Sequence, residues 1–339
     1  MPGQPVAGSP APALSGGDAD MTMQAQQRLI ELGRPAALDS LIGPHRRGPG
    51  DPTHRRLGPG HWLRASLTPA GPVLLRLAAA GATVSARAWG TGADWALDQL
   101  PMLLGAADDP SGFVPRPEHE ALVQAHRRFG AELRVGRTER VWEAMAPACL
   151  EQVVTGTEAF RAFRLLVGEF GEPAPGPATD PSSAAYRMRV PPPAEVWARI
   201  PSWKFLAAGV EQRRSATLVR AAGRATALER TLQVEGTAAD TALRSLPGIG
   251  GWTSAEVRQR AHGDPDAWSI YDYHVAKHIT YALVGEPLDD AACLEIIEPY
   301  RGHRYRVQLL LNMSAPRRPR RGPRMSLPTH TPYATKGRS

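Results

Sequence analysis

Hydrophobic and polar positions change their periodicity about one third of the way along the chain. Short apolar or alternating runs predict strands over 62–67, 73–77 and 83–89, followed by a helix over 93–104. From residue 115 on, apolar positions recur at helical spacing. The helices expected there cover 117–129, 138–150, 155–169, 193–199, 203–220, 221–233, 237–246, 252–261, 272–284, 289–296 and 303–313. The pattern predicts a small β-rich module ahead of a larger helical domain.

The pattern is weaker outside these two regions. We expect residues 1–50 to form a disordered or weakly structured tail, because the first 20 are rich in Pro, Gly, Ala and Ser. One helix is expected over 23–32. The Pro-rich stretch 171–193 interrupts the helical series and is expected to cross between two helical lobes. Residues 317–339 are basic and Pro-rich, which predicts an extended or disordered tail.

Composition narrows the class of protein. The 339-residue chain carries a formal net charge of +7, which favours a polyanionic partner. Its two cysteines, Cys149 and Cys293, cannot form a disulfide framework and exclude a four-cysteine iron–sulfur cluster. No stretch approaches the ~20 apolar residues of a membrane span. The first 20 residues lack a basic start and an apolar core, so we expect no signal peptide and a cytoplasmic location.

A Gly-rich turn lies between two of the expected helices. Residues 243–255 read Leu-Arg-Ser-Leu-Pro-Gly-Ile-Gly-Gly-Trp-Thr-Ser-Ala. Pro247 ends the first helix, and Gly248 and Gly250 can adopt positive φ and let the backbone approach another group. N–H groups and the dipole at the start of the next helix form an anion site. Because the tip carries no charged side chain, we expect the hairpin to bind phosphate and not to read base sequence. A plain turn between helices with a glycine cap is the alternative.

The hairpin and the later Asp272-Tyr273 segment resemble the helix-hairpin-helix DNA glycosylases, especially the bacterial DNA-3-methyladenine glycosylase II type. Three further segments match that family: 141–156, 201–203 and 298–304. The resemblance is good over 115–316, weak over 55–114 and absent over 1–50. It implies a mainly α fold, with a two-lobed helix-hairpin-helix core over 115–316 and a small N-terminal α+β domain over 55–114.

The resemblance makes Asp272 the catalytic carboxylate. Cleavage of an N-glycosidic bond develops positive charge on the sugar, which a carboxylate stabilises while it orients or deprotonates a water. Asp272 also precedes an expected helix and can serve as its N-cap, and the two roles are compatible. Trp252 stands where strand-cleaving members carry a lysine that attacks the sugar, so a monofunctional enzyme is expected.

The resemblance also implies DNA contacts. The hairpin residues expected at the DNA backbone are Leu246, Pro247, Gly248, Ile249, Gly250, Gly251 and Thr253. Gln152 and Val153 stand in the position of a wedge that fills the gap left by a flipped nucleotide. An ordinary turn between two helices is the alternative for this pair. A metal ion bridging hairpin carbonyls to a phosphate is implied as well, with no ligand from side chains.

The expected base pocket contains Trp252, Glu256, Tyr273, Trp203, Tyr300 and His303. Trp252 would stack on an electron-poor alkylated purine, with a core position as the alternative. Glu256 replaces a tyrosine of the best-known family form. It would either accept a hydrogen bond from the base or pair with Arg260 at i+4 on the surface. Trp203 fits the pocket and the core equally.

The expected function is that of a monomeric enzyme acting on double-stranded DNA that contains a damaged base. It would flip an N-alkylated adenine or guanine, hydrolyse the glycosidic bond and leave an abasic site in base-excision repair. No redox or organic cofactor is expected. The alternatives are a glycosylase for a deaminated or oxidised base, and a non-catalytic DNA-binding protein that keeps the hairpin.

Overall fold

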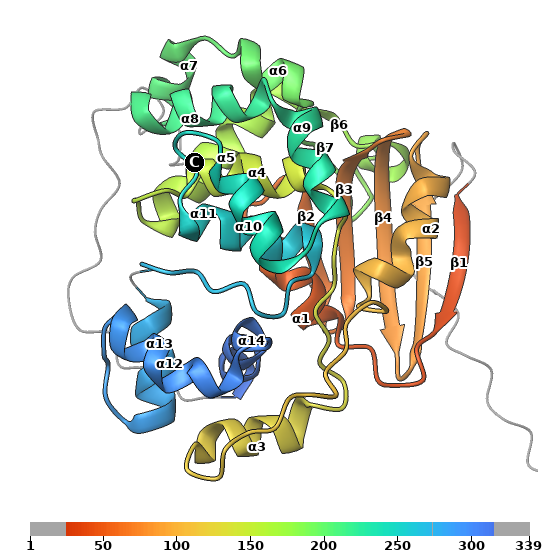
Figure 1. The fold of residues 1–339 in the computed structure, drawn as a ribbon. Coiled ribbons are helices and arrows are strands. Elements are labelled where there is room, and N and C mark those ends of the chain that lie inside the picture. The colour runs from red at the N-terminus through yellow and green to blue at the C-terminus, as the bar shows by residue number, and fades with distance from the viewer. Residues whose placement is uncertain (1–24, 273, 315–339) are drawn as a thin grey trace, which may run out of the picture.

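The computed structural model describes residues 25–272 and 274–314, which form a β-sheet module and two helical lobes (Figure 1). The fold is mainly α, with a small N-terminal α+β domain, which confirms the predicted fold class. Among the described residues, no helix has the length and apolar content needed to cross a bilayer.

Five antiparallel strands form the sheet, in the order β1-β5-β4-β3-β2. They are β1 (Gln26–Glu31), β2 (His54–Gly58), β3 (His61–Thr68), β4 (Gly71–Ala80) and β5 (Thr83–Trp89). One face packs on α1 (Leu38–Ile42) and α2 (Ala93–Leu103), with Leu77 and Leu100 in its core. The other face, around Leu74 and Trp89, is covered by residues 174–190. Because both faces are covered, β4 reads as a nearly continuous apolar run.

The predicted N-terminal tail is wrong from residue 25 on. Residues 26–31 form an edge strand that pairs with β5, and Leu41 and Ile42 lie in the module's core. The helix expected over 23–32 is therefore a strand where it is described, because pairing with β5 overrides a weak local propensity. The domain begins earlier than the expected residue 55. Residues 1–24 and the expected tail 317–339 lie outside the described residues.

The first lobe is built around α4, which is buried along nearly its whole length. Its elements are α4 (Val141–Leu150), α5 (Gly156–Phe170), α6 (Ala194–Arg199), α7 (Ser202–Ala207), α8 (Gln212–Ala222), α9 (Ala225–Glu229), η3 (Arg230–Gln233), α10 (Gly236–Arg244), α11 (Gly251–Val257) and the π-helical turn η4 (Arg258–His262). Gly209, at φ 85°, separates α7 from α8, where one helix was expected.

The second lobe combines one early helix with the last three. Its elements are α3 (Glu120–Phe129), α12 (Val275–Val284), α13 (Asp290–Ile297), η5 (Glu298–Tyr300) and α14 (Arg304–Ser314). Although α3 precedes the first lobe in sequence, it packs on α12 and α14 (Figure 1). A buried ion pair, Arg306 Nη2 to Asp108 Oδ1 at 2.6 Å, attaches α14 to the segment that leads from the sheet module into α3.

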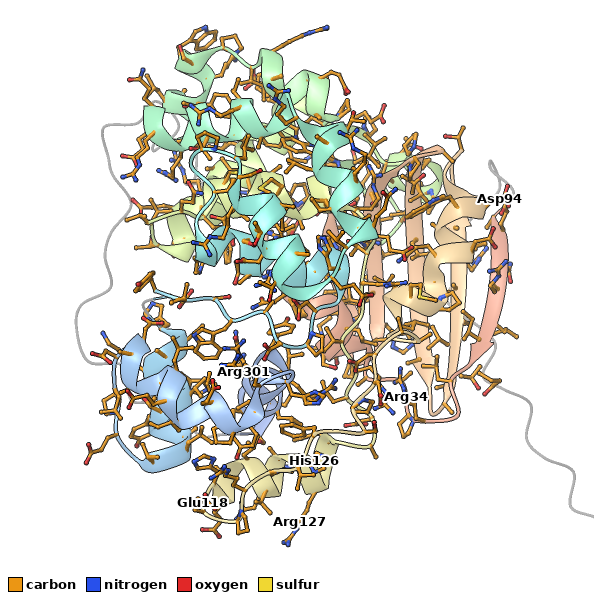
Figure 2. The ribbon with its side chains drawn as sticks, in the orientation of Figure 1. Arg34, Asp94, Glu118, His126, Arg127 and Arg301 are labelled. Carbon is orange, nitrogen blue, oxygen red and sulfur yellow. The ribbon has the colours of Figure 1, made fainter. Side chains whose placement is uncertain are left out.

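The Pro-rich stretch takes a different path from the predicted one. The helices at its two ends, α5 and α6, belong to the same lobe. Between them β6 (Glu172–Pro173), η2 (Gly176–Thr179) and β7 (Arg189–Val190) lie against the sheet. The chain crosses between the lobes at 130–140 and 263–274 instead. Arg34 lies at the junction of the sheet module with the first of these crossings (Figure 2) and donates to Leu104 O and Glu132 O.

Candidate active site

In the hairpin between α10 and α11, Gly248 has the positive φ that the sequence allows, and Gly250 does not. Gly248 has φ 95°, and a Cβ there would lie 2.5 Å from Thr217 Oγ1. Ile249 inserts into the core of the first lobe. Gly250 has φ −93° and caps α11, so the positive φ expected for it is wrong. Apart from its chain neighbours, no described residue lies within 4 Å of the position of a Gly250 Cβ.

Asp272 is held at the start of α11 by an indole. Trp252 Nε1 donates to Asp272 Oδ2 at 3.1 Å, which joins the second residue of α11 to the crossing segment 263–274. The other oxygen, Oδ1, accepts from the backbone N–H groups of His274 and Val275 at 2.9 and 3.0 Å, where α12 begins. Three donors thus orient the half-buried carboxylate, two of them N–H groups at the start of α12. The N-cap residue of α12 is His274, two residues after the expected Asp272. The catalytic role of Asp272 stays a prediction.

The turn between α4 and α5 lies against the hairpin. Gln152 Nε2 donates to Gly248 O at 3.0 Å and to Thr253 Oγ1 at 2.9 Å. The next residue, Val153, has φ 52° and is 96% exposed. Positive φ is unfavourable for a β-branched residue, so the surrounding turn imposes it. Gln152 is therefore committed to the hairpin, and Val153 is the residue that projects.

Glu256 lies in the interior and not on the surface. Its predicted contact with the base stays a prediction. Its Oε2 accepts from Arg260 Nη1 at 2.7 Å and its Oε1 accepts from Ser269 Oγ at 2.6 Å. The i+4 pair with Arg260 exists, but it is buried and not on the surface. Burial alone would lower the pKa of Arg260, but the Glu256 carboxylate raises it and keeps the guanidinium charged. With both oxygens engaged, Glu256 ties α11 to the crossing segment.

Three other expected pocket residues make their polar and ring contacts elsewhere. The Tyr300 hydroxyl is buried in the second lobe, where it accepts from the N–H of Arg116 and bonds to His119 Nδ1. His303 packs against a phenylalanine ring of that lobe, and its Nδ1 accepts from an arginine of α14. Trp203 is 59% exposed on α7. None of these contacts involves the Trp252–Asp272 pair, and Tyr273 lies outside the described residues.

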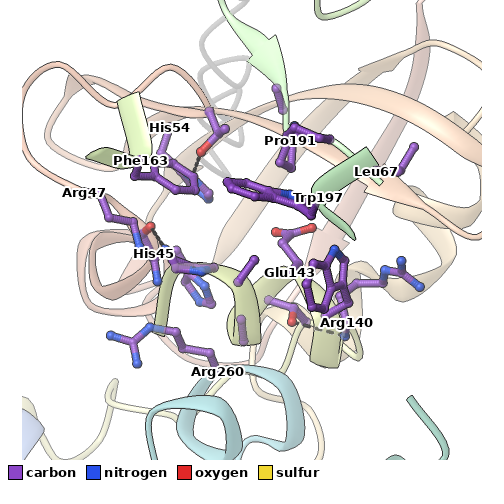
Figure 3. A pocket seen from close by; sticks show the side chains of 18 residues that line it. His45, Arg47, His54, Leu67, Arg140, Glu143, Phe163, Pro191, Trp197 and Arg260 are labelled. Carbon is purple, nitrogen blue, oxygen red and sulfur yellow. Dashed lines mark hydrogen bonds between the residues drawn. The ribbon is translucent and has the colours of Figure 1, made fainter. Parts of the chain in front are cut away.

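A second titratable cluster, which the sequence did not reveal, lines a cavity of about 30 Å³ between the sheet module and the first lobe (Figure 3). Thr53 Oγ1 donates to Asp51 Oδ1 at 2.8 Å and lies 2.8 Å from His54 Nδ1. Because a hydroxyl has one proton to donate, Thr53 accepts from His54 Nδ1. Nε2 of His54 is then an acceptor, and it has no hydrogen-bond partner among the described residues. The space suffices for about one or two waters.

Burial keeps both histidines of this cluster neutral. It lowers the pKa of His54 to about 4 and holds the pKa of His45 well below its ordinary value, with Arg64 contributing to both. The two rings stack with centroids 6.0 Å apart. A proton on either would place an unpaired charge in the interior.

Stability is therefore expected to fall as the pH decreases from about 6.5 to about 4, because only the unfolded chain takes up these protons in that window. For His54 alone the loss is about 3 kcal/mol. Above pH 6.5 the two states are equally deprotonated and the effect vanishes. The measurement is urea unfolding at several pH values, wild type beside His54→Asn. An asparagine amide can still donate to Thr53 but does not titrate, so an unchanged pH dependence in the variant would contradict this assignment.

The fold is that of the helix-hairpin-helix DNA glycosylases. No family model matches the sequence, and no curated protein matches it significantly. The 3-methyladenine DNA glycosylase from Archaeoglobus fulgidus matches over 84% of this chain and 97% of its own, with a TM-score of 0.66 and 19% identity. The apo-form of the 8-oxoguanine glycosylase/lyase of Clostridium acetobutylicum matches over 87% of this chain and 100% of its own, with a TM-score of 0.64 and 12% identity. The complex of that enzyme with DNA containing cytosine opposite 8-oxoguanine matches over 86% of this chain and 96% of its own, with a TM-score of 0.62 and 10% identity. At these identities the similarity establishes the fold.

Proposed function

We propose that this chain is a monofunctional DNA glycosylase that removes alkylated purines of the 3-methyladenine type from duplex DNA. The observation that carries the proposal is the Trp252–Asp272 hydrogen bond, which holds a carboxylate at the edge of an indole ring at the start of the hairpin helix. The match to 3-methyladenine and 8-oxoguanine glycosylases along nearly their full length supports a DNA glycosylase, and the choice of an alkylated purine rests on the aromatic ring of Trp252 beside Asp272.

In the proposed reaction the hairpin binds a phosphate of the damaged strand and Val153 enters the base stack. The flipped purine packs against Trp252. An N-alkylated purine is cationic, so the electron pair of the C1′–N bond leaves with the base, which departs neutral. Asp272 stabilises the positive sugar that develops, and accepts the proton of the water that adds to C1′. The products are a free base and an abasic site.

Trp252 cannot form a Schiff base, so we propose that the enzyme does not cleave the strand. We also propose that it acts as a monomer and without a redox or organic cofactor. At the hairpin tip, Pro247 O accepts from Arg220 Nη1 at 2.8 Å, and Gly248 O accepts from Gln152. These carbonyls are already engaged, so a bridging metal ion stays a prediction and no step above uses one.

Gly250→Ala is expected to weaken binding to every duplex sequence alike while leaving the melting temperature close to wild type. A Cβ at Gly250 meets no described residue beyond its chain neighbours, but it stands where a phosphate would approach the backbone. Gly248→Ala is the matched comparison, because its positive φ and its clash with Thr217 should lower stability as well. The measurements are Kd for two undamaged duplexes of unrelated sequence, and Tm. A loss confined to one sequence would contradict the phosphate contact.

The function is tested by release of free base from methylated duplex DNA. The same assay is run on duplexes carrying 8-oxoguanine and hypoxanthine, each with a borohydride trap. Release of methylated purine with no trapped adduct supports the proposal. Release of 8-oxoguanine or hypoxanthine alone would favour a glycosylase for oxidised or deaminated bases. A trapped adduct would indicate lysine chemistry, and tight binding without release would indicate a DNA-binding protein.

A further inference from the structure

Tyr271, directly before Asp272, combines a strained backbone with an exposed ring. Its φ is 65°, a conformation that glycine and asparagine adopt readily and that is unfavourable for a bulky aromatic residue. Its side chain is 80% exposed. The backbone is held in place by Asp290 Oδ1, in the first turn of α13, which accepts from the Tyr271 N–H at 2.9 Å. The Asp272 N–H also donates to Ser269 O at 3.2 Å, so Tyr271 occupies the third position of a turn that both contacts hold.

Tyr271 and Val153 occupy related positions around the hairpin. The neighbour of Val153, Gln152, bonds to Thr253, while the neighbour of Tyr271, Asp272, bonds to Trp252. Two consecutive residues of α11 therefore bond to the neighbours of two exposed residues, and both exposed residues have an unfavourable positive φ.

Neither the strain nor the exposure serves the free protein. An asparagine would relax the backbone, and a ring that is four-fifths exposed contributes little to packing. Strained, over-determined residues gather at ligand sites, where the bound partner uses the conformation. An exposed aromatic side chain next to a carboxylate suits a flat, positively charged partner, which gains both stacking and a cation–π attraction.

We propose that Tyr271 is a specificity-determining residue whose ring stacks on the flipped base held beside Asp272. This inference rests on the proposed function and adds a second aromatic face to that of Trp252. The ring favours a cationic alkylated purine over a neutral base, because a neutral base gains stacking alone. Tyr271 thereby helps to reject undamaged purines that enter the site.

The test compares Tyr271→Asn, which keeps the left-handed backbone and removes the ring, with Tyr271→Phe, which keeps the ring. Single-turnover release of 7-methylguanine is measured from duplex DNA, together with Kd for the undamaged duplex and Tm. Tyr271→Asn should slow release by about 10-fold, with an unchanged or higher Tm and little change in Kd for undamaged DNA. Tyr271→Phe should retain most of the rate. Val114→Asn, which removes another exposed apolar side chain, is the control and should match wild type.

Release by Tyr271→Asn at the wild-type rate would overturn the inference. So would an equal loss of affinity for undamaged DNA, which would make Tyr271 a general backbone contact. If the wild type itself releases no methylated purine from this duplex, the proposed function fails, and the inference fails with it. The wild-type rate therefore separates the two failures.

Discussion

Replacing Asp272 with asparagine is expected to reduce base excision by at least about 100-fold while DNA binding stays close to wild type. The substitution removes the negative charge that stabilises the developing positive sugar. It keeps the shape of the side chain and an oxygen that can accept from the N–H groups of His274 and Val275, so the start of α12 should keep these contacts. The measurements are single-turnover release of 7-methylguanine, Kd for duplex DNA, and Tm.

Asp289→Asn supplies the matched control for this prediction. Asp289 caps α13 through Oδ1, which accepts from the Ala292 N–H at 3.0 Å, and it lies on the surface. The same chemical change at the start of another helix should leave excision unaltered. If Asp272→Asn excised at the wild-type rate, Asp272 would only hold the start of α12. If both variants lost activity equally, the cause would be the folding of the second lobe.

The features predicted correctly from the sequence are those that local chemistry dictates. Pro247 and Gly248 mark the end of one helix and a backbone with positive φ whatever surrounds them. The strands β3, β4 and β5 follow from short apolar runs, and the helices after residue 115 follow from their spacing. The position of Asp272 just before a helix could be predicted because the apolar helix begins just beyond it.

The features that were missed depend on partners far away in the chain. Arg260 Nε donates to Pro44 O, 216 residues away, so the guanidinium that pairs with Glu256 lies against the N-terminal module. The edge strand β1 exists only because β5 pairs with it, 52 to 62 residues later in the register. The N–H of Tyr271 is held by Asp290, 19 residues on. No spacing within one segment carries these contacts, so hydrophobic periodicity could not indicate them.

Glu256→Gln is expected to destabilise the protein by about 3 kcal/mol, which corresponds to a fall in Tm of roughly 5–10 °C. The substitution leaves the buried guanidinium of Arg260 without its nearest counter-charge. It also replaces one acceptor oxygen with an NH2 donor. This donor faces another donor, either the guanidinium of Arg260 or the hydroxyl of Ser269. Removing one partner of a buried pair costs more than the pair itself contributes, because the remaining charge has no access to water.

Glu298→Gln is the control for that loss, because Glu298 pairs with Arg301 on the surface, where both side chains are at least half exposed. An exposed pair of this kind contributes little, so Tm should change by about 1 °C or less. The same two variants decide between the roles predicted for Glu256. At temperatures where Glu256→Gln is folded, the ratio of released 3-methyladenine to 7-methylguanine should equal that of wild type. A changed ratio at unchanged stability would mean that the carboxylate contacts the base, and that the ion pair with Arg260 opens when DNA binds.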